Sequence, residues 1–156
     1  MKRQYFLYLA LAGSALLMIG ALLFQYVGQM PPCKMCYWQR YPHIAALAIG
    51  ALLFVYRAQI FAWLGFAMMV TTAGIGGYHA GVEQGWWKGP QSCTGASVET
   101  LTAEELLEKI MTSPVVRCDE IPWSLFGLSM AGWNMVFSAG LAFAWLMFVK
   151  GNKAHG

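Results

Sequence analysis

The cysteines are the residues of this sequence whose type and spacing point most directly to chemistry. Cys33 and Cys36 form a CxxC pair, whereas Cys93 and Cys118 stand further along the chain. A CxxC pair occurs in redox dithiols, structural bridges and zinc knuckles, so its neighbours must separate these uses. All four cysteines lie outside the long apolar runs, as expected in a compartment that permits disulfides.

Arg40 favours a reactive CxxC pair over an inert bridge. It follows Cys36 by four residues, and Pro42 suits the first turn of a helix that can extend backward by about one turn. If helical geometry reaches Cys36, the thiol and the guanidinium share a face. The guanidinium and the positive helix end then stabilise a thiolate. Arg40 is also a candidate to bind a quinone carbonyl, with a flanking interfacial cation as the plain alternative.

Cys93 and Cys118 admit a structural interpretation as well as a redox one. A bridge between them would by itself be a staple that restricts the unfolded chain. Beside an activated CxxC pair, the same bridge can exchange by thiolate attack, which would make the two pairs a relay. A four-cysteine zinc site is disfavoured, because the second pair is not spaced as a knuckle. We therefore predict two redox-active pairs and no metal.

His79 is a further candidate for the site. It follows an apolar run on the side of the chain that carries the cysteines, where an imidazole can donate to a quinone oxygen or shuttle a proton. A satisfied interfacial histidine is the commoner explanation, and it applies more strongly to His43, which comes directly after Pro42. His79 is therefore kept as a candidate quinone-binding residue, and His43 is not.

Four apolar segments must position these residues. The 156 residues are 58% hydrophobic and 11% charged, whereas a soluble domain carries about 25% charged residues. The apolar runs cover residues 5–27, 37–56, 60–78 and 130–149, and they suit a hydrocarbon layer of about 30 Å. We predict an all-α integral membrane protein, a four-transmembrane-helix bundle that forms a single domain over residues 1–156. The second run has a short apolar core, so its start must lie near the membrane surface.

The four spans place a short loop, about residues 28–40, and a long loop, about residues 79–129, on one side of the membrane and both termini on the other. All four cysteines then face one compartment. Cations are denser near the terminus side, which favours cytoplasmic termini and periplasmic cysteine loops. In the second loop, a capping-box pattern at Thr102 and Glu105 predicts a short amphipathic helix. A net charge of +3 without a basic stripe argues against nucleic-acid binding.

Three features follow one another along the chain: PPCKMCYWQR at 31–40, the pair Cys93 and Cys118, and WSLFGLSMAGWN at 123–134. Together they resemble the DsbB family of thiol–quinone oxidoreductases, which are multi-pass proteins of the bacterial inner membrane. The resemblance covers nearly the whole chain. It implies that the partner is a periplasmic DsbA-type thiol oxidase, which attacks a Cys93–Cys118 bridge through a transient mixed disulfide at Cys93.

The same resemblance implies the rest of an electron path. Cys118 would pass electrons to Cys33 and Cys36, and Cys36 would be the thiolate that faces the quinone. Arg40 and His79 would lie near this cofactor, a ubiquinone or menaquinone drawn from the pool in the lipid bilayer. The protein would supply positioning and thiolate stabilisation, while the redox chemistry belongs to the quinone.

Two other functions stay open at this stage. A vitamin K epoxide reductase-type enzyme also joins thiols to quinones in a four-span bundle, but its loop cysteines precede the CxxC pair, whereas here they follow it. A tetraspanin-like scaffold would use both pairs as structural staples. The large loop lacks the CCG motif of such scaffolds, and a scaffold gives no reason for Cys36 and Arg40 to share a face.

Overall fold

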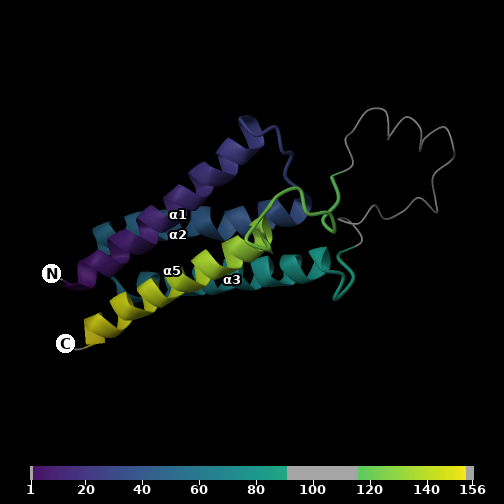
Figure 1. Ribbon diagram of the computed structural model, residues 1–156. Helices are drawn as coiled ribbons and strands as arrows, with labels where there is room; N and C mark the ends of the chain where they lie inside the picture. The colour runs from purple at the N-terminus through teal and green to yellow at the C-terminus, as the bar shows by residue number, and fades with distance from the viewer. Residues whose placement is uncertain (1, 91–115, 154–156) are drawn as a thin grey trace, which may run out of the picture.

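A computed structural model describes residues 2–90 and 116–153. Within these residues, four long helices run side by side as a bundle, with a small β-hairpin before the last helix (Figure 1). The elements are α1 (Lys2–Tyr26), α2 (Lys34–Tyr56), α3 (Gln59–Glu83), β1 (Ser124–Leu125), β2 (Leu128–Ser129) and α5 (Met130–Lys153). The start of α1 and the end of α5 lie at the same end of the bundle (Figure 1). The amphipathic helix predicted in the second loop lies outside the described residues.

Within the described residues, three helices are long and apolar enough to cross a membrane. They contain the segments Gln4–Tyr26, Gln59–Glu83 and Met130–Gly151. The remaining helix, α2, has 23 residues, but its first two turns carry Lys34 and Arg40, in line with the short apolar core noted in the sequence. A helical, multi-pass membrane protein is therefore confirmed, and the fourth span remains a prediction.

The site lies where two helices extend beyond the predicted limits. The first is α2, which begins at Lys34 because Cys33 caps it: the Cys33 backbone is extended, and its Sγ accepts a hydrogen bond from the Cys36 amide at 3.2 Å. The second is α3, which continues to Glu83, past the predicted end at residue 78, because apolar contacts persist there and Val82 is buried. Its last turns therefore carry His79 and Glu83 on a rigid helix.

Close helix contacts hold the bundle together, and α3 lies against both α2 and α5. At Gly65, an added Cβ would come within 2.5 Å of the Trp145 ring, which is fully buried. At Gly76, it would lie 3.0 Å from the carbonyl oxygen of Ala131. Small residues at such positions let membrane helices approach closely. The shapes of these contacts thus fix the register of α3 against α5.

The hairpin of β1 and β2, two strands of two residues each, was not predicted from the sequence, although the fold as a whole is helical as predicted. Its two central residues, Phe126 and Gly127, have φ of 51° and 77°, which suits a two-residue turn between antiparallel strands. Ser124 pairs with Ser129, and Trp133 Nε1 donates to the Leu125 carbonyl at 3.0 Å. This bond attaches the hairpin to the first turn of α5. The hairpin therefore lies beside the N-terminal end of that helix.

Candidate active site

The CxxC pair lies at the start of α2 as two free thiols in close contact. The Sγ atoms of Cys33 and Cys36 are 2.9 Å apart. Cys33 is buried, and it shares an apolar cluster with Met35, Val82 and Cys118. Cys36 is half-buried and reaches a neighbouring cavity. Cys36 and Arg40 belong to one helix and line the same cavity.

Cys118 comes from the segment before the hairpin and meets the CxxC pair inside the protein. Its Sγ, the Cys33 Sγ and a ring nitrogen of His79 all lie within 4.8 Å of one another. Cys118 is fully buried and disulfide-bonded. The second loop thus delivers one sulfur directly to Cys33. The predicted partner of that sulfur, Cys93, lies outside the described residues.

His79 of α3 lies against the Cys33 thiol and the Gln39 side chain. Its Nε2 is 3.6 Å from Cys33 Sγ, and its Nδ1 is 2.8 Å from the Gln39 side-chain nitrogen. Among the described residues that line the cavity, His79 is absent. One turn along α3, the buried carboxylate of Glu83 has an oxygen 3.8 Å from His79 Nε2. Sequence reasoning missed Glu83, although its spacing four residues after a candidate histidine was a usable signal.

Arg40 reaches across from α2 to α1. Its guanidinium donates to Gln25 Oε1 at 2.6 Å and to the Ala21 carbonyl at 3.2 Å. It also stands over the Tyr37 ring, 5.4 Å from the centroid. Within the part of the chain that the structure describes, Arg40 has no carboxylate within ion-pairing distance. Its positive charge is therefore left to act on the cavity and on Cys36.

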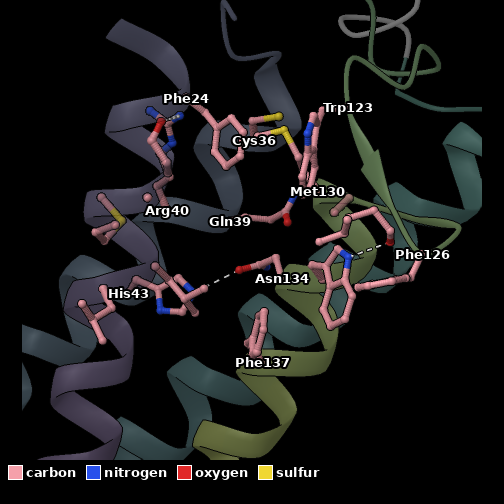
Figure 2. Close-up of a pocket in the computed structure, with 18 residues that line it drawn as sticks. Phe24, Cys36, Gln39, Arg40, His43, Trp123, Phe126, Met130, Asn134 and Phe137 are labelled. Carbon is pink, nitrogen blue, oxygen red and sulfur yellow. Dashed lines mark hydrogen bonds between the residues drawn. The ribbon is translucent and has the colours of Figure 1, made fainter. Parts of the chain in front are cut away.

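A cavity of about 350 Å³ lies beside Cys36 and Arg40 between α1, α2 and α5. Figure 2 shows Cys36 and Arg40 near one end of it and His43, Asn134 and Phe137 further along. Its walls are mostly apolar and aromatic, with a few polar side chains, as is typical of sites for apolar cofactors. The lining residues are Leu16, Leu17, Met18, Gly20, Ala21, Phe24, Cys36, Gln39, Arg40, His43, Trp123, Leu125, Phe126, Met130, Ala131, Trp133, Asn134 and Phe137.

A chain of hydrogen bonds runs through the bundle from the thiols to the far part of this cavity. Gln39, which contacts His79 through its side chain, accepts at its carbonyl from Thr72 Oγ1 at 2.9 Å. Asn134 Nδ2 donates to that Thr72 oxygen at 3.2 Å, and Asn134 Oδ1 is 3.2 Å from His43 Nε2. Sequence reasoning had set His43 aside. These partners come from three helices, so the sequence spacing of any one helix could not reveal them.

The two thiols of the reduced pair differ in acidity. The hydrogen bond from the Cys33 thiol, with a smaller contribution from the Arg40 charge, lowers the pKa of Cys36 below that of an ordinary thiol, against the effect of burial. The same hydrogen bond, together with burial, raises the pKa of Cys33 well above its usual range. In the reduced pair, Cys36 is therefore the thiol that loses its proton first, and Cys33 keeps its proton to higher pH.

The reduced protein is expected to react with iodoacetamide at Cys36 at a lower pH than a free cysteine does. Only the thiolate is alkylated, and a lowered pKa means that the thiolate persists as the pH falls towards that value. Arg40→Gln removes a cation that favours the thiolate, so the midpoint of the alkylation rate should move to higher pH. The rate is followed by mass spectrometry of the peptide that contains Cys36.

Arg57→Gln is the matched control, because it removes a cation at the opposite end of α2. It should leave the midpoint unchanged. A midpoint that stays in place in Arg40→Gln would show that the guanidinium does not tune this thiol.

The cluster of Cys33, His79 and Cys118 has the atoms and the spacing of a partial metal site. Zinc, however, is bound by cysteine as a thiolate, and Cys118 is in a disulfide. In this state the cluster offers a metal one thiol and one imidazole, together with a sulfur that is already bonded. The donor set therefore suits disulfide exchange better than metal binding.

The comparisons with known proteins point in one direction. The family description "Disulfide bond formation protein DsbB" matches residues 2–148. A protein of Hahella chejuensis named disulfide bond formation protein B is 32% identical, over 91% of this chain and 92% of its own length. A protein with the same name from Shewanella sp. strain MR-4 is 33% identical, over 91% of this chain and 85% of its own length. Another from Dechloromonas aromatica is 29% identical, over 97% of this chain and 95% of its own length. No solved structure matches the chain.

Proposed function

Because the chain belongs to the DsbB family of membrane disulfide bond formation proteins, we propose that it is a thiol–quinone oxidoreductase of the bacterial inner membrane. It reoxidises a periplasmic DsbA-type dithiol protein and crosses the membrane four times. Its termini are cytoplasmic and both cysteine loops are periplasmic. This topology is supported by the arrangement of the bundle. The start of α1 and the end of α5 lie at one end, and the start of α2 and the 116–123 segment lie at the other (Figure 1).

The approach of Cys118 to Cys33 is the observation that carries the proposal. In the first exchange, a thiolate of the partner attacks Cys93 of a Cys93–Cys118 disulfide, and Cys118 leaves as a thiolate. Cys118 then attacks Cys33 of an oxidised Cys33–Cys36 pair, from a distance within 4.8 Å, and Cys36 leaves as a thiolate. Each exchange forms one S–S bond and breaks one, so two electrons pass from the partner to Cys36 without an added oxidant.

The residues around Cys36 fit a quinone. The cavity volume lies in the range of small-molecule sites, its walls are apolar and aromatic, and its polar groups are few. A bound quinone supplies the acceptor for two electrons and two protons. Cys36 faces that acceptor as a thiolate, and Arg40, held by Gln25 and Ala21, supplies a fixed positive charge for a ring oxygen.

His79 is assigned to the thiols in this mechanism, in place of the quinone contact predicted from the sequence. Its Nε2 lies 3.6 Å from Cys33 Sγ, a distance at which an imidazole can exchange a proton with a thiol. Cys33 must lose its proton whenever the pair is oxidised. Glu83, beside the imidazole, is placed to stabilise the positive charge that His79 gains.

Turnover by the purified protein tests the function. The full chain in detergent is mixed with a reduced DsbA-type protein and excess ubiquinone or menaquinone, and quinone absorbance is followed. We expect quinone loss and partner oxidation in equal amounts, since each event transfers two electrons. A partner whose two cysteines are replaced by serine is the control and should give no reaction.

The scaffold interpretation predicts a different result in the same experiment. There, both cysteine pairs would stay bridged in mild reductant, and quinone absorbance would not change. That outcome would refute the oxidoreductase function and leave a membrane protein stapled by disulfides.

A further inference from the structure

His43 lies deep in the cavity and has one nitrogen without a partner. The side chain is 2% exposed, and it lines the cavity together with Cys36 and Arg40. Its Nδ1 is buried and, among the described residues, makes no hydrogen bond. Buried polar atoms are nearly always hydrogen-bonded, so an orphaned one in a cavity wall indicates a missing partner.

The surroundings of His43 fix which nitrogen carries its proton. Asn134 Nδ2 donates to Thr72 Oγ1 at 3.2 Å, which turns the Asn134 carbonyl oxygen towards His43. Ser138 Oγ also donates to that oxygen, at 3.3 Å. His43 Nε2 is 3.2 Å from the same oxygen and 3.3 Å from Ser138 Oγ. Because the Asn134 oxygen only accepts, and the Ser138 hydroxyl donates to that oxygen, Nε2 is the protonated nitrogen. In the neutral imidazole, Nδ1 is consequently a bare acceptor.

The position of His43 on α2 relates it to the proposed redox centre. Cys36, Arg40 and His43 follow one another at helical spacing along one face of α2, and all three line the cavity. Arg40 and His43 are separated by about 4.5 Å along the helix axis. A quinone ring has oxygens on opposite sides, so a ring that meets Arg40 with one oxygen can extend the other towards His43.

We infer that His43, held by Asn134 and Ser138, accepts a hydrogen bond from the far hydroxyl of the reduced quinone. The inference rests on the proposed use of a quinone. A bare Nδ1 can accept from a quinol hydroxyl, but it offers nothing to a quinone carbonyl, which is itself an acceptor. This hydrogen bond therefore strengthens binding of the quinol relative to binding of the quinone. By favouring the reduced form, His43 makes the bound cofactor a stronger oxidant of Cys36.

Binding of the two redox forms tests this inference without turnover. The ligands are decylubiquinone and decylubiquinol, added without oxygen to the full chain in detergent. Every variant carries Cys33→Ser, so that the chain has no dithiol with which to exchange electrons. Quenching of tryptophan fluorescence reports occupancy, because Trp123 and Trp133 line the cavity. The quantity compared is the ratio of the two dissociation constants, quinone over quinol.

His43→Phe should lower this ratio about fivefold, the effect of one net hydrogen bond. His43→Leu serves the same purpose where the phenylalanine variant does not fold, as judged by thermal unfolding. Trp145→Phe is the matched control. The Trp145 Nε1 is also buried without a hydrogen-bond partner among the described residues, but Trp145 does not line the cavity, so the ratio should not change.

The outcomes separate this inference from the proposed function. Binding of both forms with the same ratio in His43 and His43→Phe proteins would overturn the role of His43 and leave the quinone site in place. Binding of neither form by the His43 protein would refute the quinone site itself.

Discussion

Replacing Cys118 with serine is expected to lower partner-driven quinone reduction on the order of 10³-fold or more, as removal of a nucleophile does in other enzymes. Cys118 is the sulfur of the second loop that the described structure brings within 4.8 Å of Cys33. Without it, electrons from the partner have no route to the CxxC pair. The initial rate is measured as loss of quinone absorbance with a saturating reduced partner.

The same variant contains its own control. A small dithiol such as dithiothreitol can attack the Cys33–Cys36 disulfide directly, so dithiothreitol-driven quinone reduction should survive in Cys118→Ser. If both donors fail, the variant has lost its fold or its quinone site. If the partner still drives full-speed reduction, Cys118 is not on the electron path.

Cys36→Ser is expected to stop quinone reduction by either donor, with a loss of similar size. Cys36 is the member of the pair that lines the cavity, whereas Cys33 lies in the apolar cluster behind it. A serine hydroxyl cannot form the disulfide that closes the cycle. Full activity with dithiothreitol in this variant would place the quinone elsewhere.

Cys36→Ser should also accumulate a disulfide between Cys33 and Cys118. The Cys33 thiolate can attack the Cys118 sulfur of a bridged second pair, and the displaced sulfur leaves as a thiolate. Thiols and disulfides are conserved in this exchange, so no oxidant is needed. Peptide mapping without reductant detects the new bridge. Cys33→Ser lacks the attacking sulfur and is the matched control.

The parts of this architecture that depend on local sequence were predictable. Long apolar runs specify helices regardless of their neighbours, and the CxxC pair with Arg40 specifies a helix start with a charge on the thiol face. The ends of the helices were harder to predict. The end of α3 was placed where the apolar run stops, yet Val82 is buried against the cysteines and carries the helix on to Glu83.

Features that depend on tertiary contact were beyond the sequence. The two-residue hairpin has Phe126 at a position with φ of 51°, where asparagine or glycine is the usual signal. His43 and Asn134 meet across 91 positions of the chain. His79 was expected near the quinone, but the direction of a side chain on a helix depends on how that helix is rotated against its neighbours. Hydropathy leaves that rotation undetermined.

The apolar walls of the cavity determine the phase from which its ligand comes. Leu16 of α1 and Phe137 of α5 both line the cavity, yet they remain 67% and 50% exposed, so in a bilayer they face acyl chains. A ligand that reaches the site between them arrives by lateral diffusion in the membrane. Its effective concentration is then a mole fraction in lipid, and added inert lipid would dilute it even when the aqueous volume stays constant. Affinities for this site are therefore comparable only at equal lipid or detergent content.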